Sequence, residues 1–513
     1  MPFFESLLVL LLAAIVLLQI SRRLTLPYPA ILAAAGVAVA MAPGSPSFPI
    51  DPELALALFI APALLDAAFD FPIATARRFW GPLVALAIGS VVVTAVSVAW
   101  AGWMFADLPI AAALVLGAIV APPDAVAATA VLSAMSIPRN TDAVLRGESL
   151  FNDAAALLLF SGALAVQTAG TLDTHVGVQL ALAVPGGVLL GIAVAKLVAF
   201  VDRYVNGTLG GNLLQFVITF LLWIVAERLE LSAVLCLVAF AMTMALDSTI
   251  GTSPRMRVHS YAVWSAVVFV LNVLAFLVMG MQARTIVSGM SVARLQNASL
   301  FAGLVLLLVV AVRFVIVLGY NRLTAWRSQR QGTAGPPTLR QGVLASWCGM
   351  RGLVTLATAF ALPADFPQRD VAVLTAFAVV IGTLVVQGLT LAPLIRLLGL
   401  DRGADRASEI ATFRAELARA ALDALSGNQG PEAERLRCDY QAKLDAGDNP
   451  AIAEVLDHQR ALGLIAVAAQ RKALEQLRAD NRLNADEYNL LLEELDWREL
   501  TLLPADQRRV EEQ

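Results

Sequence analysis

Two short segments decide the fold of this chain: Gly117-Ala-Ile-Val-Ala-Pro-Pro-Asp124 and Gly147-Glu-Ser-Leu-Phe-Asn-Asp153. Each places carboxyl groups inside a run of residues that is otherwise apolar enough to cross a lipid bilayer. An ionisable side chain at that depth is costly, and membrane proteins keep such residues where they serve a function. The two segments therefore predict a membrane protein with a polar site between two of its helices.

The composition of the whole chain agrees with a membrane protein. Of its 513 residues 58% are hydrophobic and 15% are charged, which lies outside the range of soluble domains. Residues 1–400 carry 38 charged side chains, as many as the much shorter segment 401–513. We therefore predict an all-α polytopic transmembrane domain over 1–400 and a soluble helical domain over 401–513. No basic run indicates nucleic-acid binding.

Thirteen apolar runs are long enough to be membrane-spanning helices. They lie near residues 5–21, 26–42, 52–69, 80–104, 109–136, 142–167, 177–201, 211–228, 231–247, 260–282, 297–320, 341–362 and 371–398. The loops between them alternate in charge, because one set holds fifteen basic residues and the other holds four. Since Lys and Arg collect on the cytoplasmic side, this predicts an N-terminus outside and a C-terminal domain in the cytoplasm.

Two local signals predict where helices begin in the C-terminal domain. Pro431 suits a first helical position, where its missing N–H has no helical partner to lose. Asn484, followed by Glu487, is typical of an N-cap with a capping-box partner. Neither signal indicates a function, so we expect this domain to pack on itself or on a second subunit.

The Pro122-Pro123 pair predicts a break in the helix that carries Asp124. It removes two backbone donors, and its rings clash with the preceding turn. Carbonyl groups released at such a break line the ion sites of many transporters. The alternative is a kink that serves packing alone, with Asp124 capping the half-helix that follows it. Both interpretations remain open at this point.

Ser149, Asn152 and Asp153 share one face of the second segment, because they are three and four residues apart. Their hydroxyl, amide and carboxylate oxygens suit a hard cation. Asp153 lies seven residues beyond Arg146, or roughly 10 Å into the helix. Burial there disfavours an isolated negative charge, so Asp153 can hold a proton or a small cation but hardly both.

Arg313 lies deep in an apolar run and requires a buried partner, since an unpaired charge there is strongly destabilising. Three carboxylates are available at depth, on Asp124, Glu148 and Asp153. We favour Glu148, as a structural ion pair that fixes helix packing.

Two further charged residues lie in apolar runs and are possible accessory groups. Arg351, between Gly349 and Gly352, indicates a second irregular helix crossing, and its partner cannot be read from the sequence. Asp66 belongs to the third run and is expected to face the interior.

These motifs, together with Trp347-Cys-Gly-Met-Arg-Gly-Leu-Val354, resemble the sodium/proton antiporters of the NhaP and NHE type, cation/proton antiporter family 1, in its bacterial branch. The resemblance implies thirteen helices in two inverted repeats, with the fifth and twelfth helices unwound where they cross. It also implies a core domain beside a dimerisation domain, a homodimer in the inner membrane, and a role in pH homeostasis.

The resemblance also implies roles for individual residues. Asp153 would be the carboxylate that exchanges cation for proton, with Asn152 and Ser149 beside it. Asp124 and the neighbouring backbone would complete the site. Glu148 and Arg313 match the buried stabilising pair of the family, and Asp66 falls near the cation path, where many members carry Glu.

One position departs from the family pattern. The usual Thr-Asp-Pro is here Pro123-Asp124-Ala125, so position 123 has only its carbonyl to offer as a ligand. Asn152 stands before Asp153, where electrogenic relatives carry a second Asp, which implies one exchangeable carboxylate and one proton per monovalent cation.

The expected function is therefore secondary active exchange of a monovalent cation (Na⁺, Li⁺ or K⁺) for H⁺ by alternating access, without a cofactor or enzymatic activity. No phosphate-binding GxxxxGK[ST] loop is present. Two other classes share some of these features. An intramembrane aspartyl protease also keeps two Asp residues in membrane helices, but its Tyr-Asp and Gly-x-Gly-Asp motifs surround neither Asp124 nor Asp153. A regulated ion channel on the same scaffold remains open.

Overall fold

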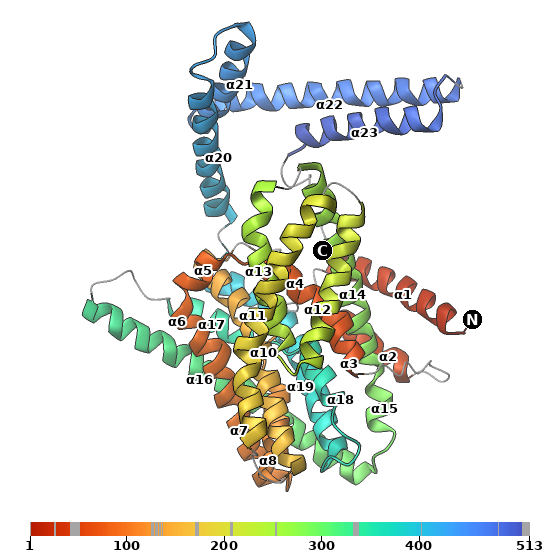
Figure 1. The fold of residues 1–513 in the computed structure, drawn as a ribbon, viewed down its shortest axis with the longest axis vertical. Helices are drawn as coiled ribbons and strands as arrows, with labels where there is room; N and C mark the ends of the chain where they lie inside the picture. Colours follow the sequence, from red (N-terminus) through yellow and green to blue (C-terminus); the bar gives the residue numbers. More distant parts are fainter. Residues whose placement is uncertain are drawn as a thin grey trace. The chain divides into compact units, whose positions relative to one another are not determined.

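The structure is a computed structural model, and it describes residues 2–24, 27–41, 52–124, 128, 132, 135, 137–169, 174–205, 209–251, 254–331, 338–401, 403–480 and 482–504. All regular elements in these ranges are helices, which confirms the all-helical prediction (Figure 1). The chain forms two compact units, Met1–Asp401 and Arg402–Glu512, which are described separately.

The first half of the larger unit runs from the N-terminus to the first decisive segment. Its elements are α1 (Pro2–Leu24), α2 (Tyr28–Met41), α3 (Pro52–Ala55), the π-helical η1 (Leu56–Ile60), α4 (Ala61–Phe69), α5 (Ile73–Arg78), α6 (Trp80–Leu83), the π-helical η2 (Val84–Gly89), α7 (Ser90–Phe105) and α8 (Ile110–Val120).

The second half begins with the helix that carries the second decisive segment. Its elements are α10 (Arg139–Ala169), α11 (Thr174–Val205), α12 (Leu209–Arg228), α13 (Ala233–Gly251), α14 (Pro254–Met281), α15 (Ala283–Val287), α16 (Val292–Gln331), α17 (Leu339–Trp347), α18 (Leu353–Phe360) and α19 (Arg369–Leu398).

Length and hydropathy make six helices of the described chain candidates to cross a membrane. They occupy Trp80–Phe105, Arg139–Thr168, Gly177–Val201, Arg257–Val287, Val292–Arg327 and Arg369–Leu398. Four more apolar helices are shorter, at Tyr28–Met41, Leu56–Phe69, Ile110–Val120 and Ala233–Leu246. The run expected over 109–136 is helical as α8 only to Val120, and most of its remainder lies outside the described residues. The run expected over 341–362 is divided into α17 and α18.

Close helix packing holds the first decisive segment in place. α8 packs along both α7 and α10, and Gly117 of α8 lies against the backbone of Ala95 in α7. A Cβ at position 117 would overlap the Ala95 carbonyl, so only glycine allows this approach. The break after Val120 is thereby fixed against the helix that carries Asn152 and Asp153.

The smaller unit contains α20 (Gly403–Leu425), α21 (Pro431–Asp448), α22 (Pro450–Ala479) and α23 (Ala485–Leu502). Pro431 opens α21, as the sequence predicted. Asn484 caps α23, because its side chain accepts from the Glu487 N–H at 2.8 Å and its own N–H donates to Glu487 at 2.9 Å. Arg471 of α22 forms ion pairs with Asp496 and with Glu499 (2.6 Å), which joins α22 to α23.

Candidate functional site

The site is built where two interrupted helices meet. α8 ends at Val120 and the chain continues without helical structure to Asp124, while residues 348–352 separate α17 from α18. The Asp124 N–H donates to the Met350 carbonyl at 2.7 Å, so one interruption is hydrogen-bonded directly to the other. Backbone groups that a continuous helix would use are thus satisfied across the crossing, as a buried chain requires.

Arg351 has backbone carbonyls as its partners. Its side chain is 1% exposed, and Nε donates to the Val120 carbonyl at 2.8 Å while Nη1 donates to the Gly349 carbonyl. Its backbone N–H donates to Thr383 Oγ1 at 2.9 Å. Because Val120 is the last residue of α8, the guanidinium lies at the negative end of that helix, where a cation is stabilising.

Asp124 lies at the N-terminal end of α18, whereas Arg351 lies at the C-terminal end of α8. A Cβ at Gly352, the residue before α18, would overlap the Asp124 carboxylate, so this carboxylate lies against the first turn of α18. The N-terminus of a helix carries the positive end of its dipole and favours a negative charge. The half-helix that follows Asp124, which the sequence suggested it caps, begins outside the described residues. Within them, Asp124 meets the N-terminus of the other interrupted helix.

Asn152 connects α10 to the first interruption. Its side chain is fully buried, and Nδ2 donates to the Pro123 carbonyl at 2.8 Å. The carbonyl at position 123 keeps a second lone pair. Asn152 Oδ1 is buried and makes no hydrogen bond to any residue that the structure describes. A buried amide oxygen without a donor is an available ligand for a cation.

Asp153 and Ser149 complete the group on α10. Both are half-buried, and the Asp153 carboxyl lies within range of the charge on Asp124. Asp153 forms no ion pair with a described residue of this chain. The site therefore brings together two carboxyl groups, an amide oxygen and a hydroxyl, with the carbonyl of Pro123 beside them.

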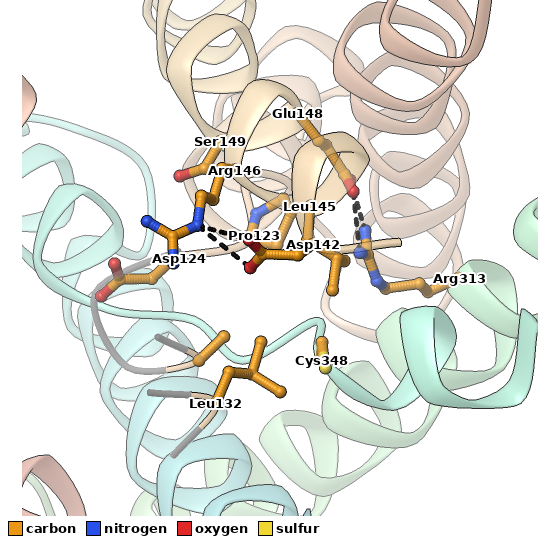
Figure 2. A pocket seen from close by; sticks show the side chains of 11 residues that line it. Pro123, Asp124, Leu132, Asp142, Leu145, Arg146, Glu148, Ser149, Arg313 and Cys348 are labelled. Atoms are coloured by element: carbon orange, nitrogen blue, oxygen red, sulfur yellow. Dashed lines mark hydrogen bonds and ion pairs between the residues drawn. The ribbon is translucent and has the colours of Figure 1, made fainter. Parts of the chain in front are cut away.

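An open cavity adjoins part of this group, at Asp124 and Ser149 (Figure 2). Its volume is about 20 Å³, room for about one water molecule, and its wall includes Pro123, Asp124 and Ser149. The side chains of Arg146 and Asp142 on the same wall are 49% and 33% exposed, so they lie toward the mouth. Cys348 also lines this cavity.

Glu148 and Arg313 form a bidentate ion pair at the buried end of the cavity. The two Nη–Oε distances are 2.6 and 3.0 Å, and each side chain is 2% exposed. Arg313 Nη2 also donates to the Ala345 carbonyl at 3.1 Å. The pair joins α10, α16 and α17, and its charges are compensated where they are buried.

Asp66 is the predicted accessory residue that the structure does not bring to this group. It is half-buried on α4, where its charge, with that of Asp70, acts on Tyr261 of α14. Asp66 is absent from the described lining of the cavity.

Sequence reasoning missed Asp142 and Arg146 as parts of the site. A signal was present, because positions 142, 146, 149 and 153 follow three- and four-residue spacing along one face of α10. In the sequence, Arg146 served only as the point from which the depth of Asp153 was measured.

Comparison with known proteins gives a family and a fold. The family described as "Sodium/hydrogen exchanger, transmembrane" matches residues 8–397. The "Sodium, potassium, lithium and rubidium/H(+) antiporter" of Bacillus pumilus is 26% identical, over 95% of this chain and 76% of its own. The "Na(+)/H(+) antiporter NhaH" of Halobacillus dabanensis is 29% identical, over 67% of this chain and 83% of its own.

A solved structure shares the fold. The sodium proton antiporter MjNhaP1 from Methanocaldococcus jannaschii, at pH 8, aligns with a TM-score of 0.56 and 18% identity. The alignment covers 78% of this chain and 100% of the archaeal one.

Proposed function

The chain belongs to the sodium/hydrogen exchanger family, and we propose that it exchanges a monovalent cation for protons with Asp153 as the group that holds each in turn. It is a multi-pass membrane transporter. The family gives no support to the two alternatives weighed from the residues, an aspartyl protease and a regulated channel.

The observation that carries this proposal is the contrast in pairing among the buried charges. Glu148 and Arg313 neutralise each other, and Arg351 is held by the carbonyls of Val120 and Gly349. Asp153 has Asp124 nearby and no cationic partner among the described residues. Two neighbouring carboxyls attract a cation or share a proton.

The proposed ligands are oxygen atoms. Asp153, Asp124 and Ser149 would hold the transported Na⁺, Li⁺ or K⁺, and the Pro123 carbonyl and Asn152 Oδ1 would contribute further oxygens. No cofactor is required, because the gradient of one ion drives the other. Protonated and cation-bound forms of Asp153 are both nearly neutral and can cross a hydrophobic barrier, whereas the bare carboxylate cannot. One titrating carboxylate then gives one proton per cation, an electroneutral exchange by alternating access.

The architecture that we propose around this cycle has thirteen spanning helices in two inverted repeats. The crossing of the interruptions after α8 and after α17 supports this arrangement. Residues 1–400 would form core and dimerisation helices of a homodimer in the plasma (inner) membrane, and 401–513 a cytoplasmic tail domain. The bias of basic residues among the loops supports an N-terminus outside and a cytoplasmic tail.

Proton flux in proteoliposomes tests the exchange. We expect addition of Na⁺, Li⁺ or K⁺ to dissipate an imposed pH gradient with saturation, and without dependence on membrane potential. Since proton and cation compete for Asp153, lowering the pH on the binding side should raise the apparent KM, by up to about tenfold per pH unit in the acid range. An apparent KM that does not change with pH would contradict a shared site, and unitary currents would contradict a carrier.

A further inference from the structure

The mouth of the cavity carries an exposed ion pair on α10. Arg146 Nε donates to Asp142 Oδ1 at 3.0 Å and to Oδ2 at 3.1 Å. Both residues line the cavity that Asp124 and Ser149 also line, as Figure 2 shows. An exposed pair of this kind, four residues apart on one helix, contributes little to stability. Its location on the path to the site is therefore its more important property.

The charges along the cavity wall are unequal from end to end. At the buried end Glu148 and Arg313 cancel, each being 2% exposed. Asp124 adds a further carboxylate to the wall. At the mouth, Asp142 and Arg146 have opposite effects on an entering cation, since the first attracts it and the second repels it. A cleft with low-dielectric walls concentrates such fields and changes the local cation concentration.

We propose that the Asp142–Arg146 pair sets the apparent cation affinity of the exchanger on the side to which this cavity opens. Asp142 is an outer attracting group, and Arg146 limits its effect by occupying its carboxylate and by opposing entry. This inference rests on the proposed function and adds to it a pair of residues that determine access without binding the transported ion at the exchange site.

The same protein contains a matched control pair. Arg294 and Asp370 form an ion pair at 2.7 Å, and their side chains are 51% and 33% exposed, against 49% and 33% for Arg146 and Asp142. Neither Arg294 nor Asp370 belongs to the described lining of the cavity. Loss of an exposed ion pair as such can therefore be separated from loss of charge at the mouth.

The experiment measures exchange kinetics in proteoliposomes of known orientation for R146Q, D142N, R294Q and D370N. We expect R146Q to lower the apparent KM for Na⁺ about threefold and D142N to raise it about threefold, with smaller changes in maximal rate. Both shifts should occur only when Na⁺ is on the side of the cavity mouth. They should shrink when choline chloride raises the ionic strength, because salt screens exposed charges. R294Q and D370N should leave KM unchanged.

Three results would overturn the inference. One is an unchanged KM in both R146Q and D142N, another is an equal shift in R294Q, and the third is a shift that does not respond to ionic strength. A charge-exchanged D142R/R146D variant, which keeps the mouth neutral, should have a KM near that of the wild type. Absence of exchange in the wild type would refute the proposed function instead, so the two failures are distinguishable.

Discussion

Glu148 and Asp153 are carboxylates on the same helix, five residues apart, in opposite environments. Glu148 is 1% exposed and is held by both Nη atoms of Arg313. Asp153 is half-buried, lies near Asp124 and has no ion pair with a described residue. The difference teaches that α10 uses one carboxylate to join helices and leaves the other without an ion pair to a described residue, as the proposed exchange requires.

The two buried arginines also differ in their partners. Arg313 is matched by a carboxylate, whereas Arg351 is matched by carbonyls at the end of α8 and in the second interruption. The guanidinium of Arg351 and the carboxylate of Asp124 therefore each stabilise the end of a helix to which they do not belong.

The largest effect is expected from Asp153→Asn, which removes the carboxylate that we propose as the exchanging group and keeps the shape of the side chain. We expect proton flux with every cation to fall to the level of empty liposomes while the protein elutes as the wild type does in gel filtration. Asp107→Asn, at an exposed position with φ 50°, is the control and should exchange normally. Full exchange by Asp153→Asn would show that Asp153, like Glu148, is not the exchanging group.

Breaking the structural pair should act on stability first. Glu148→Ala or Arg313→Ala leaves one buried charge alone, and we expect each to lower the free energy of unfolding by about 3–5 kcal/mol. Thermal unfolding in detergent measures this effect. The double variant E148L/R313M should be more stable than either single variant, because it buries no charge. Singles with wild-type stability would show that the pair is not structural.

A smaller effect is expected from Gly352→Ala, which moves Asp124 without altering a charge. The added Cβ would overlap the Asp124 carboxylate and displace it from the start of α18. We expect the maximal exchange rate to fall about tenfold or more, since small displacements of a reacting group are costly. Gly303→Ala on α16 meets nothing within 4 Å and should behave as the wild type. Equal rates in the two variants would mean that the position of Asp124 is not critical.

The smallest effect is expected from Pro123→Thr, which restores the family residue at the position of departure. The Asn152 bond to the carbonyl at 123 should persist, because it does not use the side chain. A new hydroxyl beside Asp124 should change the ratio of KM values for Na⁺ and K⁺ about twofold. Competition measurements with the two ions check this. An unchanged ratio would indicate that position 123 acts through its carbonyl alone.

Local patterns in the sequence are sufficient for part of this description. The apolar runs, the helix starts at Pro431 and Asn484, and the shared face of Ser149 and Asp153 follow from hydropathy, capping chemistry and helical periodicity. The same applies to the need of Arg313 for a buried partner, because an isolated charge in an apolar run is unstable. The family could be recognised because its motifs are contiguous.

Tertiary structure alone decided the rest. Arg351 finds its carbonyl partner 231 residues away, and carbonyl groups, which every residue carries, leave no local signal of the pairing. Asp124 likewise meets α18 because two interruptions cross. The Asp142–Arg146 pair lies on the wall of a cavity that α10 forms together with other segments, so α10 alone does not reveal its location. The sequence by itself thus determined which residues are chemically capable, since that depends on side chains and spacing. Their environment, paired or available, depends on contacts between distant segments, and only the folded chain decides it.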